Sequence, residues 1–135
     1  MLTAEVTIKP QFHDFDPMQV VWHGNYARYL EEARAALLDR IGYNYPEMVA
    51  SGLAWPIVDM QLKYIRPIRY GQRIRVTATL VEYEHRLRFD YRLRDEAGGE
   101  ILTKARTTQL AVRISDGELM FASPQELLDK VRALL

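Results

Sequence analysis

The stretch DPMQVVWHGNY, residues 16–26, leads directly into the longest helical pattern of the chain. From its last residue onward, apolar side chains recur at spacings of three and four, which is typical of a helix with one buried face. These side chains are Tyr26, Tyr29, Leu30, Ala33, Leu37 and Ile41. Asn25 is a favoured N-cap residue and Gly42 a favoured C-cap residue, so we predict a helix of about four turns between them.

Strands are predicted for most of the remaining chain. A short strand is expected within residues 4–12, interrupted near Pro10, and longer strands within residues 54–65, 73–83, 87–94 and 100–114. Ser123 then opens a short terminal helix as its N-cap, with Glu126 at the capping-box position. Because the connections are too short for parallel crossovers, we predict an α+β fold in which a curved antiparallel sheet wraps around the long central helix.

The composition fits one globular domain that spans residues 1–135. The 18 Lys and Arg residues balance the 18 Asp and Glu residues, which argues against nonspecific nucleic-acid binding. The absence of Cys excludes disulfides, thiolate metal sites and cysteine nucleophiles. The first residues lack the pattern of a secretory signal, and no apolar run is long enough for a membrane span. We therefore expect a cytoplasmic protein.

Two motifs carry a resemblance to a known family. The first is Asp16-Pro17, followed seven residues after the aspartate by His23 and then by Asn25-Tyr26 at the helix start. The second is the sequence YIRP at residues 64–67 with Tyr70-Gly71 after it. In these motifs and in element order, from about Val6 to Phe121, the chain resembles the hotdog-fold thioesterases. The closest resemblance is to the 4-hydroxybenzoyl-CoA thioesterase family and its YbgC-like acyl-CoA thioesterase branch.

The resemblance implies a fold, an assembly and a substrate. In that family the sheet surrounds a central helix, two subunits pair their sheets across a two-fold axis, and two dimers often form a tetramer. A homodimer or homotetramer is therefore expected, with active sites at subunit interfaces. The implied substrate is an acyl-CoA thioester, and no metal or other cofactor is expected.

The chemistry of thioester hydrolysis points to the same stretch. The reaction needs a group that attacks the carbonyl carbon or activates water, and it needs donors for the oxyanion that develops. With no Cys and no G-x-S-x-G motif, a carboxylate is the natural candidate. Asp16 lies just before a helix whose first N–H groups lack intrahelical acceptors and can polarise a carbonyl. One continuous segment can thus supply both the acid and the oxyanion site.

The resemblance maps the catalytic aspartate of the family onto Asp16 and the site histidine onto His23, whose backbone N–H would polarise the carbonyl. Some relatives carry a tyrosine four residues before the aspartate, where this chain has Phe12. Two questions stay open at this point. Asp16 can attack directly and form an anhydride, or it can act as a general base. His23 can act through its ring or its backbone N–H, or it can only shape the loop.

Further residues are predicted to bind the substrate. Trp22 and Tyr26 can shape the acyl pocket, with core packing as the alternative role. Asp59 can line that pocket or lie on an exposed sheet face. The resemblance assigns the CoA nucleotide to the turn before Leu87, which makes Arg86 and Arg88 the predicted phosphate ligands. The alternative is that these arginines belong to the solvent-exposed face of the sheet.

Other polar residues are considered as alternative site residues or are assigned to loops and turns. Another branch of hotdog enzymes keeps its carboxylate on the central helix, which makes Glu31 and Glu32 alternatives, although their charged neighbours favour a solvated or interface face. His13 and Asp14 are interpreted as loop residues, and His85 as a turn residue. No standard metal site matches the spacing of His13, Asp14, Asp16 and His23, so no metal is predicted.

The sequence thus predicts an acyl-CoA thioesterase that releases a free acid and CoA. The alternative is a non-catalytic hotdog module that binds acyl-CoA or acyl carrier protein, or that serves in an assembly. Phe12 supports this alternative, because the hydroxyl of the relatives is missing. A hotdog dehydratase needs a different arrangement of Asp and His that this sequence lacks.

Overall fold

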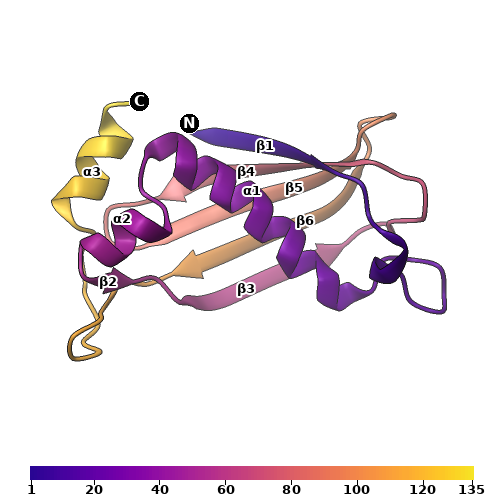
Figure 1. Cartoon of the computed structure of the whole chain (residues 1–135). Helices are drawn as coiled ribbons and strands as arrows, with labels where there is room; N and C mark the ends of the chain where they lie inside the picture. The colour runs from indigo at the N-terminus through magenta and orange to yellow at the C-terminus, as the bar shows by residue number, and fades with distance from the viewer.

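The long helix α1 lies across one face of a five-stranded antiparallel sheet in the computed structural model, which describes residues 1–135 (Figure 1). The helices are α1 (Tyr26–Ile41), α2 (Tyr45–Ala50) and α3 (Gln125–Arg132), with short 3-10 helices at Phe12–Asp14 and His23–Asn25. The strands are β1 (Thr3–Ile8), β2 (Leu53–Ala54), β3 (Ile57–Tyr64), β4 (Ile74–Glu82), β5 (Leu87–Asp95), β6 (Ile101–Gln109) and β7 (Val112–Arg113). This is the α+β hotdog arrangement predicted from the sequence.

The sheet has the order β1-β4-β5-β6-β3, and every neighbouring pair is antiparallel. Alternate residues of β4 and β5 are buried against α1, as their period of two predicts. These residues are Ile74, Val76, Ala78 and Leu80 on β4, and Leu87, Phe89, Tyr91 and Leu93 on β5. β4 and β5 therefore supply apolar side chains that pack beneath the helix, which also lies close to β1.

The predicted helix is confirmed almost residue for residue. Its apolar stripe is buried in the core, and Leu30, Ala33 and Leu37 are fully inaccessible to solvent. The helix ends at Gly42, whose φ of 85° is left-handed and whose N–H donates to the carbonyl oxygens of Leu38 and Asp39. A side chain there would be strained, which explains the glycine.

Neither predicted N-cap residue caps its helix through its side chain: Asn25 occupies the N-cap position of α1 without a capping bond, and Ser123 is not the N-cap of α3. Asn25 has helical backbone angles and makes no capping bond, because the 3-10 turn His23–Asn25 extends the helix by three residues toward its start. Ser123 lies one residue before the N-cap, which is Pro124, and its hydroxyl donates to the Tyr83 carbonyl oxygen at 2.5 Å. In both cases a tertiary partner holds the polar side chain that a cap would use.

Two predicted strands are each divided in the structure. The stretch 100–114 leaves the main sheet after Gln109, and β7 then pairs with β2 in a separate two-stranded ribbon. The stretch 54–65 is divided in the same way into the end of β2 and the whole of β3. The ribbon starts where the N–H of Leu110 donates to the Pro56 carbonyl oxygen.

Strand β3 forms one edge of the sheet and pairs only with β6. Its side chains are exposed on both faces, including Val58 at 54% and Met60 at 37%. An edge strand with exposed apolar side chains and unpaired backbone groups is a ready template for pairing with another chain. No helix of the chain has both the length and the apolar character needed to cross a bilayer.

Candidate functional site

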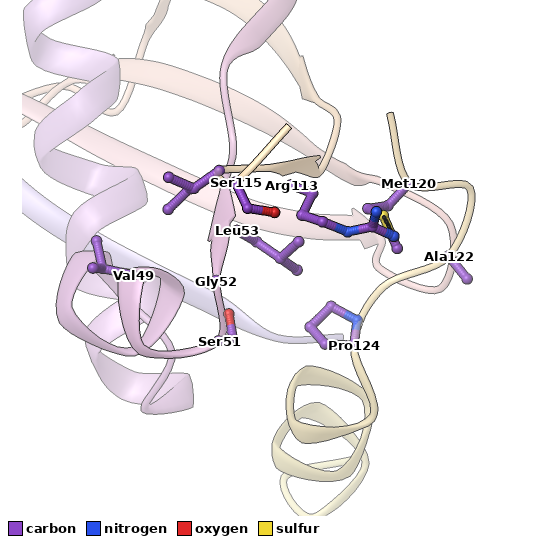
Figure 2. Close-up of a pocket in the computed structure, with 10 residues that line it drawn as sticks. Val49, Ser51, Gly52, Leu53, Arg113, Ser115, Met120, Ala122 and Pro124 are labelled. Atoms are coloured by element: carbon purple, nitrogen blue, oxygen red, sulfur yellow. Dashed lines mark hydrogen bonds between the residues drawn. The ribbon is translucent and has the colours of Figure 1, made fainter. Parts of the chain in front are cut away.

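Hollows occur at both ends of the sheet. One, of about 690 Å³, lies between α2, β2 and the segment that leads into α3, and Arg113 reaches along it toward Met120 (Figure 2). The guanidinium of Arg113 is already paired with Asp116 at 2.9 Å and with Glu118 at 3.2 Å. This hollow does not include any predicted catalytic residue, all of which lie near the start of α1.

The segment before α1 folds into a tight turn that fixes Asp16. The N–H of Asp16 donates to the Val20 carbonyl oxygen at 3.0 Å, and Gln19 adopts a left-handed φ of 63°. One carboxylate oxygen of Asp16, Oδ1, accepts the N–H of Met18 at 2.8 Å. The other oxygen, Oδ2, makes no hydrogen bond within the chain, so it is free to act on a substrate or on water.

The start of the helix presents two free N–H groups. Neither His23 nor Gly24 donates its N–H to a backbone or side-chain acceptor, because the first N–H groups of a helical segment have no acceptor in the extended chain before it. The ring of Trp22 lies over Gly24, where a Cβ would come within 2.2 Å of a ring carbon. Two unpaired donors at the positive end of a helix form a suitable site for an oxyanion.

A cleft of about 290 Å³ brings several predicted residues together. Asp16, His23 and Tyr26 all line it, and Tyr64 and Arg66 complete its polar wall. The hydroxyl of Tyr64 donates to the His23 carbonyl oxygen at 3.3 Å, and its ring meets the buried Tyr26 ring edge-on at 4.8 Å. The structure therefore joins the predicted acid, the histidine and the helix start in one cleft.

Trp22 and Phe12 border this site without lining the cleft. The indole of Trp22 lies 5.1 Å from the His23 ring and is half exposed. Phe12 is 85% exposed and lines an outer hollow of about 730 Å³ that also contacts Asp16. Asp16 thus lies between two hollows, with a substrate approach available from either side.

Asp59, Arg86 and Arg88 lie away from the cleft. Asp59 and Arg88 both align with Thr108 of β6, whereas Tyr64 aligns with Thr103, five residues or roughly 17 Å along the same strand. Arg86 pairs with Glu82 at 3.0 Å. Within one chain, these three predicted substrate ligands therefore lie near the opposite end of the sheet.

The alternative carboxylates on the helix also lie outside the cleft. Glu31 and Glu32 are both exposed on α1. Glu31 lines a separate cavity between α1 and α2, and neither residue forms an ion pair. No three His, Asp or Glu side chains gather closely enough to hold a metal ion.

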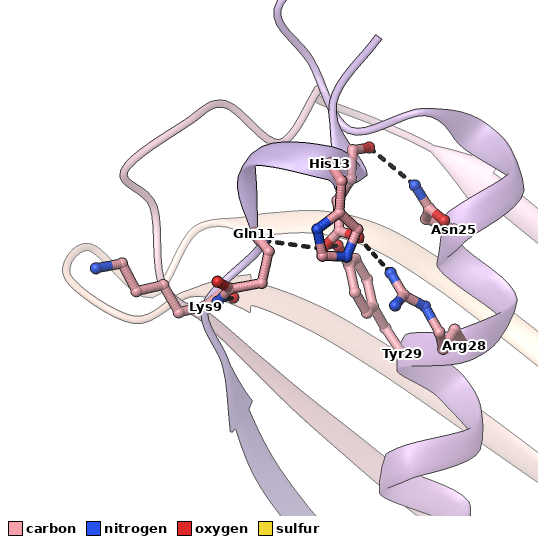
Figure 3. Close-up of polar contacts among 7 residues, drawn as sticks. Lys9, Gln11, His13, Asn25, Arg28 and Tyr29 are labelled. Atoms are coloured by element: carbon pink, nitrogen blue, oxygen red, sulfur yellow. Dashed lines mark hydrogen bonds and ion pairs between the residues drawn. The ribbon is translucent and has the colours of Figure 1, made fainter.

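Asp14, which the sequence suggested was a loop residue, is the buried centre of a polar network (Figure 3). Its Oδ2 accepts from the Gln11 N–H and from the Tyr29 hydroxyl, both at 2.9 Å, and its Oδ1 pairs with Arg28. Its carbonyl oxygen accepts from Asn25 Nδ2 at 2.8 Å and from the Trp22 N–H at 2.9 Å. Asp14 therefore ties the turn that carries Asp16 to the first turns of the helix.

The charge of Asp14 is stabilised in the folded protein. Burial by itself would raise the pKa of Asp14, but the hydrogen bonds from Gln11, Arg28 and Tyr29 outweigh it and lower the pKa below its usual range. Burial, together with the bond to Asp14, raises the pKa of Tyr29. Because folding lowers the pKa of Asp14, the charged carboxylate stabilises the folded protein fully at pH values above the unfolded pKa of about 3.9. This stabilisation is lost as the pH falls through the lower pKa of the folded state.

Sequence reasoning missed Asp14 and Tyr64 as parts of the site. The only signal for Asp14 was its position two residues before Asp16 in a stretch already marked as functional. Tyr64 stood in the second motif, but no local pattern indicated that its hydroxyl would reach His23, 41 residues earlier in the chain.

The chain is similar to known proteins in sequence and in fold. A family model described as the thioesterase-like superfamily matches residues 10–131. The 1,4-dihydroxy-2-naphthoyl-CoA hydrolase of Thermosynechococcus vestitus is 30% identical over 105 residues, which cover 76% of this chain and 71% of that protein.

Two solved structures share the whole architecture. The DHNA-CoA thioesterase of Staphylococcus aureus superposes with a TM-score of 0.85 at 26% identity, over 99% of this chain and 93% of the other. The hypothetical protein TT1821 of Thermus thermophilus has a TM-score of 0.85 at 30% identity, over 98% and 99% of the two chains.

Proposed function

Because the chain belongs to the thioesterase-like superfamily, we propose that it hydrolyses an acyl-CoA thioester to a free acid and CoA. Relatives named thioesterase and hydrolase support thioester hydrolysis as its reaction. The observation that carries the proposal is the shared cleft of Asp16 and His23, with a free carboxylate oxygen near two unpaired helix N–H groups. We also propose that the chain lies in the YbgC-like branch of the 4-hydroxybenzoyl-CoA thioesterase family, since it keeps the spacing from Asp16 to His23.

These groups supply what the hydrolysis of a thioester requires. The thioester carbonyl oxygen accepts hydrogen bonds from the N–H groups of His23 and Gly24, which stabilise the negative charge that develops on it. Asp16 either takes a proton from the attacking water or attacks the carbonyl carbon itself, forming an anhydride that water then cleaves. In both routes the C–S bond breaks and the CoA thiolate takes up a proton, so that one water is consumed for each acid and thiol released.

The aromatic side chains give the cleft its shape. The ring of His23 is exposed, has no hydrogen-bond partner in the chain and is free to contact the substrate. Tyr26 is 2% exposed and forms the inner wall, and burial raises the pKa of its hydroxyl, so it stays neutral. Trp22 covers Gly24 and forms the rim next to the oxyanion donors.

We propose that two chains pair along β3. The strand is an exposed antiparallel edge, and a two-fold axis at its middle would place the start of one β3 beside the end of the other. Asp59, Arg86 and Arg88 of one chain would then approach the cleft of the other chain, where the arginines could bind CoA phosphates. Pairing of two such dimers would give a homotetramer.

Charge placed on the β3 edge tests this assembly. The double substitution Val58→Lys and Met60→Lys puts four like charges across the proposed axis, and we expect a monomer that has lost most of its hydrolysis. Light scattering coupled to gel filtration gives the mass, and thiol release gives the rate. The matched control is Val81→Lys, on an exposed position of β4, which should leave both unchanged. A double variant that keeps the mass of the wild-type assembly would contradict pairing through β3, and a fully active monomer would contradict a site shared between the two chains.

A panel of thioesters distinguishes between the two hypotheses, an enzyme and a non-catalytic binding module. Thiol release is measured for short, long and aromatic acyl-CoAs and for acyl groups on acyl carrier protein. We expect hydrolysis of at least one acyl-CoA with a kcat/KM of about 10⁴ M⁻¹s⁻¹ or more. Tight binding of these thioesters without any thiol release would instead support a non-catalytic module, in line with the missing hydroxyl at Phe12.

A further inference from the structure

The cavity that Glu31 lines, between α1, α2 and β2, has a volume of about 550 Å³ and is separate from the cleft of Asp16 and His23 in the same chain. Most of its lining is apolar, including Leu38, Met48 and Trp55. It shares three lining residues, Val49, Leu53 and Ile114, with the hollow in Figure 2, so the two are adjoining parts of one depression. A cavity of this size and lining suits the apolar body of a small ligand.

Arg34 is a buried cation in this cavity without an acid to neutralise it. It is 9% exposed, it forms no ion pair, and its one hydrogen bond goes to the Tyr91 hydroxyl at the long distance of 3.4 Å. That hydroxyl is already engaged with Thr107 at 2.7 Å. Glu31, at the exposed rim of the same cavity, lies beyond ion-pair distance. A guanidinium has five N–H donors, so most donors of Arg34 lack a partner within the chain and face the open space of the cavity, where a bound ligand group would replace water.

Gln109 adds a second unsatisfied group to the same cavity. Its Nε2 donates to the Trp55 carbonyl oxygen at 2.7 Å, which fixes the orientation of the amide. Its Oε1 is buried and has no hydrogen-bond partner. Burying a polar atom without a partner costs free energy, as does burying an uncompensated charge. Donors on Arg34 and an acceptor on Gln109 together fit a ligand group that carries oxygen.

The position of the cavity connects it to the proposed active site. Arg34 lies 11 residues after His23, or roughly 16 Å along α1, which is too far for a short acyl group bound in the same chain. Trp55, however, lies just before β3, whereas the cleft lies at the other end of that strand. Two-fold pairing along β3 would bring the cavity of one chain to the cleft of its partner.

We infer that this cavity receives the far end of the acyl group, and that Arg34 and Gln109 select acyl groups ending in an oxygen, either a carboxylate or a phenolic hydroxyl. The inference rests on the proposed function and on pairing through β3. A carboxylate would neutralise Arg34, and a phenol would accept from Arg34 while donating to Gln109 Oε1. A plain alkyl end would leave both groups unsatisfied and would be rejected for that reason.

Matched substrates test the selection. The carboxylate arm compares adipoyl-CoA with hexanoyl-CoA, and the phenol arm compares 4-hydroxybenzoyl-CoA with benzoyl-CoA. In the wild-type protein we expect kcat/KM to favour the oxygen-bearing member of at least one pair by about 10- to 100-fold. In Arg34→Met this preference should fall to about twofold or less, because a plain end then leaves no cation without a partner. The arm that shows the preference identifies the terminal group.

Further variants keep the test independent of folding and of catalysis. Arg34→Met removes a buried charge and should not lower the melting temperature, whereas Gln109→Glu places a carboxylate in the cavity and should abolish the preference for adipoyl-CoA. Binding of a non-hydrolysable thioether analogue of each substrate, measured by calorimetry, should show the same dependence on Arg34.

Two outcomes separate this inference from the proposed function. If kcat/KM and binding are equal within both pairs, and unchanged in Arg34→Met, the inference is overturned and the proposed function stays intact. Binding that depends on Arg34 without any thiol release would overturn the proposed function instead.

Discussion

Asp16→Asn is expected to lower kcat for acyl-CoA hydrolysis by about 10²- to 10⁴-fold, because an amide can neither take a proton from water nor attack a carbonyl carbon. The fold should persist. The amide oxygen of asparagine can still accept the Met18 N–H, so the turn of Asp16 keeps its local hydrogen bond. Thiol release at saturating substrate measures kcat, and the melting temperature shows that the variant is folded.

Asp59→Asn is the matched control for this experiment. It makes the same chemical change on an exposed strand, at a carboxylate whose only hydrogen bond comes from the side chain of Gln61. Because Asp59 is proposed to touch the substrate and not the reacting bond, its effect should appear mainly in KM and stay within about tenfold. A folded Asp16→Asn variant with wild-type kcat across the acyl-CoA panel would refute the catalytic role of Asp16.

Asp14→Ala is expected to lower the free energy of unfolding by about 3 kcal/mol and the melting temperature by about 10 °C. The substitution removes an acceptor from the Gln11 N–H, the Tyr29 hydroxyl and Arg28 at once. Tyr29 is buried and would lose its hydrogen-bond partner, whereas the half-exposed Arg28 can turn to water. Thermal unfolding near neutral pH measures the loss.

Asp90→Ala is the matched control, since Asp90 also pairs with an arginine, Arg106, through two hydrogen bonds. The hydrogen bond from Arg106 holds the pKa of Asp90 below its usual range. This pair lies on the open face of the sheet with both side chains partly exposed, so its removal should cost about 1 kcal/mol or less. An equal loss of unfolding free energy in the two variants would show that the buried network of Asp14 stabilises the protein no more than the exposed pair of Asp90 and Arg106.

The pH dependence of the melting temperature gives a second test of the Asp14 network. The pKa of Asp14 is lowered by folding, so the wild-type protein loses this contribution once the pH falls below about 4, as the carboxylate gains a proton. The gap in melting temperature between the wild-type protein and Asp14→Ala should therefore be widest at neutral pH and should narrow in acid. A gap that is constant across pH would assign the loss to packing alone.

The elements of the fold could be predicted because their signals are local. The apolar spacing of α1, the left-handed Gly42 and the alternation along β4 and β5 depend only on neighbours in the chain, and the structure confirms all of them. The N-caps and the division of the strand after Gln109 could not be predicted in this way. They depend on bonds to distant residues, such as the one from Ser123 to Tyr83.

The same distinction applies to the candidate site. The segment that carries Asp16, His23 and the helix start could be identified from the sequence as a candidate site, because these groups are close in the chain and their chemistry follows from residue type and helix geometry. The tertiary structure was needed to show that Asp14 is buried among five hydrogen-bond partners and that Asp59 lies at the other end of the sheet. It was also needed to show that Arg34 faces a cavity without an acid. Burial and hydrogen bonding depend on which distant segments meet, and that is fixed only when the whole sheet packs around the helix.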